Sequence, residues 1–351
     1  MKKIILSMAV LTATFFASCS KESETINNSL INPVEGSVVT LSFVEGDNLT
    51  RAFFDENAAA EKWESELESV TIFAFDASES DSNGSLIVRR DFSDGEMDVK
   101  KSTFALPGTS EGDKVNVVVI ANCTIPMDVV TATALQSMVN SNLADYNGTF
   151  SEVATASKRT DGFVMTSQND VEVSADITKI DAILERTVAK VAIELTLAEE
   201  FSDRYSGDLL IQSIEVSNTP SMTTLHSSFD YGYELAKNYT HLQATNVSST
   251  NKFQNLFYIY ESEVPTSDDE KVLLTIEAIY DMDGKFDTTG DQTPMTYTIA
   301  LEDGSTIKNI DRNSYYRISG TIYGLSGSDA EISITVSDWS TVTNKDITLG
   351  N

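Results

Sequence analysis

The sequence is poor in the residues that most enzymes and metal proteins use at their sites. Its 351 residues include two histidines, His226 and His241, and two cysteines, Cys19 and Cys123. These are too few for a zinc site of the ordinary type, and they give no disulfide framework. Basic residues are also scarce, since 24 Lys and Arg stand against 54 Asp and Glu. The net charge of −30 repels nucleic acid, so we expect no nucleic-acid partner.

Recognisable catalytic motifs are missing as well. The segment GLSGS at 324–328 lacks the spacing of a nucleophile elbow, and no glycine-rich phosphate loop is present. Both histidines lie in polar sequence that is typical of surface loops, which gives a Ser-His-Asp triad no support. Adjacent acids such as Glu199 and Glu200 flank an expected strand, where solvated loops are more common than glycosidase sites. The sequence therefore predicts no catalytic residue and no cofactor, and a hydrolase is kept only as an alternative.

The N-terminus has the composition of an export signal. Lys2 and Lys3 precede an apolar run at 4–16, which is too short for a membrane-spanning helix. Small residues then lead to Cys19, an arrangement that resembles the lipobox of bacterial lipoproteins, in which this cysteine carries the lipid. An ordinary cleaved signal with a coincidental cysteine is the alternative. Residues 20–29 read as a polar tether, so we expect an anchored protein that projects into an extracytoplasmic space.

The remaining sequence predicts mainly β-structure in two domains. Its length suits two domains, and 41% hydrophobic residues are enough for packed cores. Alternating apolar positions predict strands at 37–44, 69–76, 85–92, 114–122 and 162–168, and again at 186–197, 209–218, 255–262, 271–281, 295–303, 314–324 and 330–340. A polar, acidic stretch at 171–181 separates the two sets. We therefore expect two β-sandwich domains joined near residue 182.

One segment between the strands has helical spacing. Apolar residues recur every three or four positions at Ala132, Leu135, Val139 and Leu143. A proline stands near the start of this segment and an Asn-Gly pair near its end, as at many helix boundaries. The spacing predicts a helix over 126–148, whereas 56–69 is either a shorter helix or a loop.

The acidic segment 281–291 carries the one metal-like signal. Clustered carboxylates are the ligands that calcium prefers, and this segment supplies Asp281, Asp283, Asp287 and Asp291. Its glycine, however, comes two residues earlier than an EF-hand loop requires. An acidic β-hairpin turn is therefore the favoured interpretation, and calcium is the alternative. Cys123 ends an apolar strand, which predicts a buried small side chain and not a reactive thiol.

The expected strand at 37–44 is followed by an isolated basic residue, Arg51. Val39, Leu41 and Phe43 alternate on one face of the strand, and their burial would contribute on the order of 5–9 kcal/mol. A cut after Arg51 would make the strand dissociable and would leave an apolar groove, which strand addition by another chain relieves. A surface arginine in a linker is the alternative.

In their order along the chain these features resemble the fimbrillin-type major pilus subunits of Bacteroides and its relatives, the type V pilins. The resemblance covers essentially the whole chain. It rests on the lipobox at Cys19, the strand before Arg51-Ala52, VVVIAN at 117–122 running into a helix, ERTVAKVAIEL at 185–195, IDRNSYYRISGTIYG at 310–324, and ITVSDWS at 334–340.

The resemblance implies a mainly β fold with two transthyretin-like β-sandwich domains and a short helix in the N-terminal domain. It implies a lipoprotein signal peptide at 1–19 and a propeptide at 20–51 that holds the removable strand. The N-terminal domain would span 52–181. The C-terminal domain would span 182–351, with a donor-strand tail at about 340–351.

The resemblance further implies a structural, non-enzymatic role. The chain would reach the outer membrane as a lipoprotein, be cut between Arg51 and Ala52 by an arginine-specific protease, and polymerise into an extracellular fimbria by donor-strand exchange. Ile347 and Leu349 of one tail would occupy the groove of the next subunit, and the donor segment would extend to residues before Trp339 if two aliphatic side chains are too few. Implied partners are other pilin subunits, the protease, the outer membrane through the lipid, and a host or bacterial surface receptor.

The alternative function is a pilus tip or accessory adhesin, or a surface glycan-binding lipoprotein. A glycan site needs an aromatic platform, and FDYGYELAKNY at 229–239 and NSYYRISGTIY at 313–323 supply tyrosines. Tyrosines at strand positions, however, commonly pack in a core.

Overall fold

The computed structural model describes residues 36–43, 62–78, 81, 83–92, 101–141, 147–150, 162–175, 177–225, 237–262, 271–303, 306–307, 310–325 and 330–338. Cys19, Arg51, Ala52, Ile347 and Leu349 lie outside these residues, so what the sequence predicts for them stays a prediction. None of the helices within the described ranges combines the length and the apolar character that crossing a bilayer requires.

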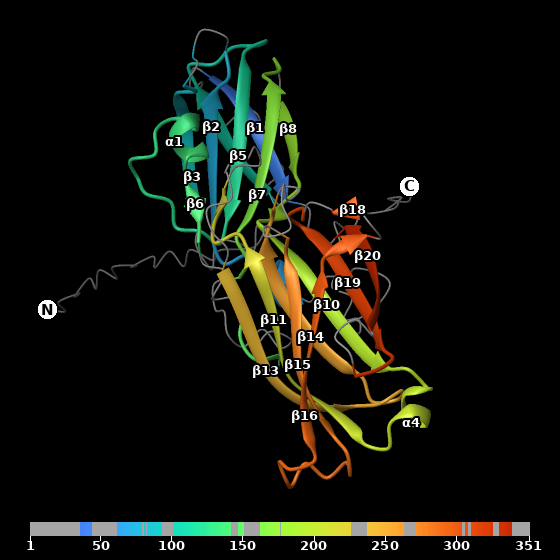
Figure 1. Ribbon diagram of the computed structural model, residues 1–351. Coiled ribbons are helices and arrows are strands. Elements are labelled where there is room, and N and C mark those ends of the chain that lie inside the picture. The colour runs from blue at the N-terminus through green and yellow to red at the C-terminus, as the bar shows by residue number, and fades with distance from the viewer. Residues whose placement is uncertain are drawn as a thin grey trace, which may run out of the picture. The chain divides into compact units, whose positions relative to one another are not determined.

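The protein is mainly β and contains two β-sandwiches, as predicted (Figure 1). One sheet of the first sandwich has the order β4-β1-β8, made of β4 (Lys101–Pro107), β1 (Gly36–Phe43) and β8 (Ile177–Ala182). The other has the order β3-β2-β5-β7-β9, made of β3 (Leu86–Phe92), β2 (Val70–Asp76), β5 (Lys114–Ala121), β7 (Met165–Glu172) and β9 (Glu185–Arg186). A short 3-10 helix, η1 (Lys62–Ser65), precedes β2.

The strands β2 and β5 are apolar at consecutive positions because both faces of their sheet are covered. On the inner face Ile72 and Val117 belong to the core that the first sandwich shares with Val39 of β1. On the outer face Phe73 and Val118 pack in a second cluster, together with residues of the helix α1 (Ala132–Gln136) and the loop before it. Double coverage thus explains the unbroken hydrophobic runs in these two strands.

The second sandwich also consists of two sheets. One has the order β14-β10-β19-β20, made of β14 (Phe253–Tyr260), β10 (Val188–Leu197), β19 (Ser314–Ile322) and β20 (Ala330–Asp338). The other has the order β13-β11-β15-β16, made of β13 (Lys237–Val247), β11 (Asp208–Thr219), β15 (Leu273–Asp281) and β16 (Gln292–Ala300). Smaller elements are β6 (Val139–Asn140), β12 (Thr223–Thr224), α4 (Phe201–Arg204), β17 (Glu302–Asp303) and β18 (Thr306–Ile307).

The two sandwiches share part of one core. Alternate side chains of β10 and β14, such as Val191 and Phe257, fill the interior of the second sandwich. The side chains between them, such as Val188, Ala192 and Tyr258, pack in the core of the first. One sheet of the second sandwich therefore buries both of its faces, which explains why β10 has almost no exposed position.

The helix predicted over 126–148 is wrong in extent. α1 covers five residues, Ala132–Gln136, and its N-cap is Thr131, whose side-chain oxygen accepts from the Ala134 N–H at 3.1 Å. The chain then forms β6, which pairs with β12, so that Asn140 stands opposite Thr223 and Val139 opposite Thr224. Val139, expected on the buried face of a helix, is 41% exposed. A long-range strand pairing has overridden the local helical spacing.

The structure contains strands that the sequence pattern does not predict. β4 has no counterpart among the predicted strands, β8 falls in the stretch expected to separate the domains, and β13 falls in sequence expected to form a loop. β13 places His241 in the core, which corrects the prediction of a surface histidine. Its ring is 1% exposed and stacks on Phe257 at 3.9 Å, and Nδ1 lies 2.7 Å from Asn255 Oδ1. His226 lies outside the described residues.

Candidate strand-exchange site

The strand β1 is the middle strand of its sheet. It runs antiparallel to β4 and parallel to β8, so that Val39 stands opposite Phe104 on one side and Thr178 on the other. The pairing with β4 begins at Gly36, opposite Pro107. The pairing with β8 ends at Phe43, opposite Ala182. In Figure 1 β1, drawn in blue, lies beside β8. The predicted strand is thus present, and it occupies a slot between two other strands.

The slot is lined by apolar side chains. Val39 is completely buried and belongs to the same core cluster as Phe104, Leu106, Ile180 and Ala182, each of which is at most 4% exposed. Leu41 pairs through its backbone with Ile180, whereas the side chains of Leu41 and Phe43 lie outside the description. Burial of such side chains contributes about 1.5–3 kcal/mol each. An extended segment that places aliphatic residues along this slot would therefore bind it well.

In the described part of the chain β4 and β8 pair with β1 and with no other strand. Strands in a sheet lie about 4.8 Å apart, so removal of β1 would leave β4 and β8 separated by roughly 10 Å. Both would then present unpaired N–H and C=O groups toward the gap. A single extended segment of the same direction restores both ladders. The site therefore consists of two backbone edges and an apolar floor.

The sequence does not identify the walls of this slot. β8 reads ITKIDA, in which Thr178, Ile180 and Ala182 alternate as its buried positions. A period-two pattern is therefore present in this segment, although its first inward residue is a threonine. The acidic residues around it favour the interpretation of a separator between domains, which the structure corrects.

The acidic segment forms the hairpin turn between β15 and β16, and it gathers three carboxylates. Oxygens of Asp281, Asp283 and Asp291 lie within 4.8 Å of one another, whereas Asp287 is not in this group. The protein itself supplies donors to each of them. Asp281 Oδ1 accepts from two backbone N–H groups and Oδ2 accepts from Gln292, while Thr288 donates to Asp291 at 2.7 Å. The calcium alternative stays a prediction.

Lys285 is the cation of this turn. Its ammonium donates to Asp283 Oδ2 at 2.9 Å. This hydrogen bond lowers the pKa of the Asp283 carboxyl and raises the pKa of Lys285 itself. Both groups are exposed, so the contact adds little to stability. A lysine at this place supplies the positive charge that a metal ion would otherwise bring.

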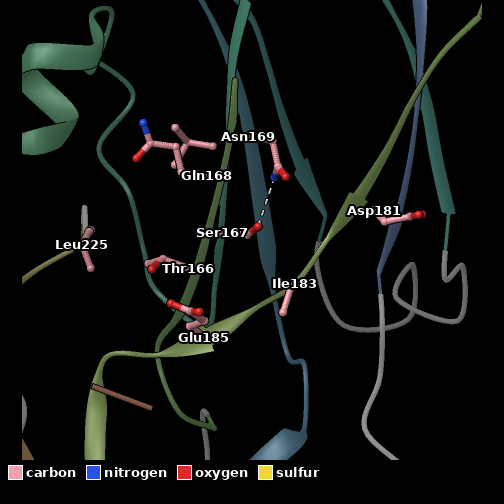
Figure 2. A pocket seen from close by; sticks show the side chains of 9 residues that line it. Thr166, Ser167, Gln168, Asn169, Asp181, Ile183, Glu185 and Leu225 are labelled. Atoms are coloured by element: carbon pink, nitrogen blue, oxygen red, sulfur yellow. Dashed lines mark hydrogen bonds between the residues drawn. The ribbon is translucent and has the colours of Figure 1, made fainter. Parts of the chain in front are cut away.

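A shallow polar pocket of about 230 Å³ lies along β7 and past the end of β8 (Figure 2). Figure 2 shows the Asn169 amide pointing to the Ser167 hydroxyl, to which it donates at 3.1 Å. Asp181 and Glu185 add carboxylates at its rim. Its lining combines hydroxyl, amide and carboxylate side chains with a few apolar ones, and it includes no histidine, cysteine or lysine.

The tyrosines considered for a glycan platform mostly pack inside. Tyr315 and Tyr316 are at most 5% exposed, and Tyr323 is 37% exposed. Tyr231 and Tyr233 lie outside the described residues. The described residues thus offer no stacked row of exposed rings to a sugar. Cys123, just past the end of β5, is partly buried, whereas the sequence predicts a buried side chain.

Solved structures with the same fold come from fimbrial and adhesion proteins. The chain is similar to a candidate cell adhesion protein from Parabacteroides distasonis, with 14% identity and a TM-score of 0.60 over 88% of this chain and 99% of that one. The chain is also similar to a fimbrilin of Porphyromonas gingivalis, with 14% identity and a TM-score of 0.55 over 87% of this chain and 98% of that one. The tip fimbrial protein Mfa3 of the same organism has 13% identity and a TM-score of 0.54 over 86% and 99%.

At these identities the solved structures establish the fold alone. Curated protein sequences give no match to this chain. The family of fimbrillin-A associated anchor proteins Mfa1 and Mfa2, in contrast, matches residues 35–345, which include both sandwiches and the strand β1. The chain therefore belongs to the family of fimbrillin-A associated anchor proteins Mfa1 and Mfa2, whose members are structural proteins of fimbriae and not enzymes.

Proposed function

We propose that this protein is a structural subunit of a cell-surface fimbria and that β1 is a removable strand. The chain is exported as a lipoprotein with its lipid on Cys19. An arginine-specific protease then cuts between Arg51 and Ala52, and the tail at about 340–351 of a second subunit replaces β1. In this scheme residues 1–19 are the signal, 20–51 the propeptide, 52–181 the N-terminal domain and 182–351 the C-terminal domain.

The middle position of β1 supports this proposal most directly. Loss of a strand at the edge of a sheet opens one backbone edge, whereas loss of β1 opens two and uncovers Phe104, Leu106 and Ile180. Such a slot favours prompt replacement by another strand. A replacement that runs in the direction of β1 keeps the antiparallel ladder to β4 and the parallel ladder to β8. Ile347 and Leu349 alternate as the slot requires.

An anchor or accessory subunit is the second candidate. Its support is the description of the matching family as anchor proteins and the similarity of fold to a tip fimbrial protein. An anchor would keep its lipid and its own β1, and it would bind the fibre through another surface. The two candidates differ at one bond, between Arg51 and Ala52.

N-terminal sequencing of the mature surface form separates the two. A subunit of the shaft starts at Ala52, and an anchor keeps a blocked N-terminus at Cys19. In the companion experiment, purified precursor is treated with an arginine-specific protease and run unboiled on a denaturing gel. We expect a ladder of polymers from the wild type and a single monomer band from Arg51→Ala.

Arg204→Ala is the matched control, because Arg204 is an exposed arginine in α4, remote in sequence from the cut. This variant should give the same ladder as the wild type. Deletion of residues 340–351 should leave a precursor that is cut but gives no ladder. Normal ladders from Arg51→Ala would refute the removable-strand proposal, and a wild-type precursor that stays uncut and gives no ladder would favour the anchor.

A further inference from the structure

The helix η1 lies where the two sandwiches meet. Trp63 of η1 stacks on Phe163, with ring centroids 5.3 Å apart, and meets the edge of Tyr258 at 6.0 Å. Phe163 and Tyr258 are themselves 4.8 Å apart. Phe163 leads into β7 of the first sandwich, whereas Tyr258 belongs to β14 of the second. Trp63 is therefore one of three aromatic rings that pack against one another where the two sandwiches meet.

The next residue, Glu64, buries a negative charge in this contact. Its side chain is completely buried, and Oε1 accepts from Lys190 Nζ at 2.7 Å and from the Tyr258 hydroxyl at 2.7 Å. Lys190 is 6% exposed in its side chain, and its ammonium lies 5.5 Å from the ring centre of Tyr315. Lys190 and Tyr258 both come from strands of the second sandwich.

Arg186 completes the arrangement from the other side. Its Nε donates to the backbone carbonyl of Glu64 at 2.7 Å, and its Nη1 donates to Asn313 Oδ1 at 3.1 Å. Asn313 stands just before β19 and has a positive φ of 56°, and its own N–H donates to the Val188 carbonyl at 2.9 Å. Arg186 lies in β9 of the first sandwich, so it reaches from there to η1 and to the second sandwich.

A buried ion pair of this kind tolerates little displacement. Removing a carboxylate and an ammonium from water is strongly unfavourable, and the loss is offset only where each charge keeps its partner at short range. A small shift between the sandwiches would leave Glu64 or Lys190 buried without that partner. Neutral contacts across the same region, such as the two hydrogen bonds between the Asn147 side chain and the Tyr258 backbone, carry no such penalty.

We infer that η1 is a clasp that fixes the two sandwiches in one arrangement, with the Glu64–Lys190 ion pair as its specific contact. The clasp means residues 62–65 together with Arg186, Lys190 and Tyr258. Hydrophobic packing alone permits several neighbouring arrangements of two sheets, and a buried ion pair selects one of them. The inference is independent of the proposed strand exchange, because none of the clasp residues belongs to β1, β4 or β8.

The test measures the distance between spin labels on the two sandwiches. Cysteines replace Glu111, exposed in the turn before β5, and Thr289, exposed in the turn between β15 and β16. The full chain carries Cys19→Ser and Cys123→Ser so that these two cysteines alone are labelled. Pulsed electron resonance should give one narrow distance distribution for the otherwise unchanged chain.

Glu64→Gln keeps the shape of the side chain and removes its charge. We expect the distance distribution to broaden or to split, while hydrogen exchange in β5 and β11 shows that both sandwiches stay folded. Glu66→Gln, the same change at an exposed residue two positions away, should leave the distribution narrow. These two variants differ in charge burial and in little else.

A second variant separates the loss of the ion pair from a general loss of stability. Glu64→Leu with Lys190→Met removes both charges of the ion pair and keeps the volume, while Arg186 keeps its hydrogen bonds to the backbone carbonyl of residue 64 and to Asn313 Oδ1. We expect it to melt within a few degrees of the wild type, since such replacements are often neutral in stability, and yet to show the broad distribution. A narrow, wild-type distribution in both the single and the double variant would overturn the clasp.

Discussion

Glu64 and Lys190 form a 2.7 Å ion pair in which both side chains are at most 6% exposed. Lys252 and Glu194 form an ion pair of nearly the same length, 2.6 Å, but the Lys252 side chain is 48% exposed. The two pairs share their chemistry and their geometry and differ in burial. They provide an internal comparison of what burial does to an ion pair in one protein.

The first prediction uses that comparison. Lys190→Met leaves the Glu64 carboxylate buried beside the Tyr258 hydroxyl and without its ammonium partner, and we expect a loss of about 3–5 kcal/mol in the free energy of unfolding. Lys252→Met should lose less than about 1 kcal/mol, because water already solvates the half-exposed Lys252 ammonium and Glu194 keeps its hydrogen bond from Gln254 Nε2. Urea denaturation of the two variants measures the difference. Equal losses would contradict the role given to burial.

The second prediction concerns the slot around β1. Val39→Ala removes two methyl groups from a completely buried position, and we expect a loss of about 1.5–3 kcal/mol in the uncut precursor. Val130→Ala makes the same chemical change at a residue that is 56% exposed, and it should be nearly neutral. Chemical denaturation of both precursors gives the comparison. A neutral Val39→Ala would show that β1 is not held by its side-chain contacts.

The third prediction concerns Asn122, which follows β5 with a positive φ of 57°. Its Nδ2 donates to the carbonyls of Glu66 and Phe163 at 2.7 and 2.8 Å, and its Oδ1 accepts from the Glu68 N–H at 2.8 Å. Asn122→Asp keeps the acceptor and sets a carboxylate against the two carbonyls. We expect it to lower the free energy of unfolding by at least about 3 kcal/mol at neutral pH.

Asn169→Asp is the control for that substitution, because the Asn169 side chain donates to the Ser167 hydroxyl on a partly exposed part of β7. It should lose less than about 1 kcal/mol. Thermal melts followed by circular dichroism suffice for both variants. Part of the loss in Asn122→Asp should return when the pH falls below the pKa of the new carboxyl, since the protonated acid donates again.

The fourth prediction concerns alkaline pH. Burial raises the pKa of Tyr239 in β13 to about 12 from its ordinary value near 10. The unfolded chain therefore loses this proton first, so the stability that the neutral phenol provides is complete below about pH 10 and is lost as the pH rises toward about 12. In this window the slope of the free energy of unfolding against pH reflects the difference in bound protons between the folded and unfolded states. Tyr239→Phe should reduce that difference by up to one proton. An unchanged slope would show that Tyr239 ionises equally in both states.

Sequence alone predicts the strands whose apolar residues form long runs or clear alternation. The ends of β2, β5 and β10 lie within two residues of their predicted ranges, because their sheets are covered on both faces. β13 escapes prediction because its outward positions are polar and its inward positions include His241, so its composition is that of a loop. The helix over 126–148 fails because β6 pairs with β12 in place of continuing α1.

The candidate site is predictable in part for a similar reason. β1 has a regular alternation that local sequence reveals, but its middle position depends on β4 and β8, which come from distant parts of the chain. Glu64 is a stronger example. Within ENAAAEKWESELES it is one acid among several, and its burial depends on Lys190 and Tyr258, which local periodicity does not connect with it.

The order β4-β1-β8 has a consequence for the time course of folding. A polypeptide emerges N-terminus first, at roughly 5–20 residues per second, so β1 is made before either of the strands that it joins. β8 ends at Ala182, and β1 therefore waits on the order of ten seconds or more for its second neighbour. Through that interval an alternating strand with two open edges must be kept from pairing with other chains. The strand that holds its sheet together is thus the first to be synthesised and among the last to be secured.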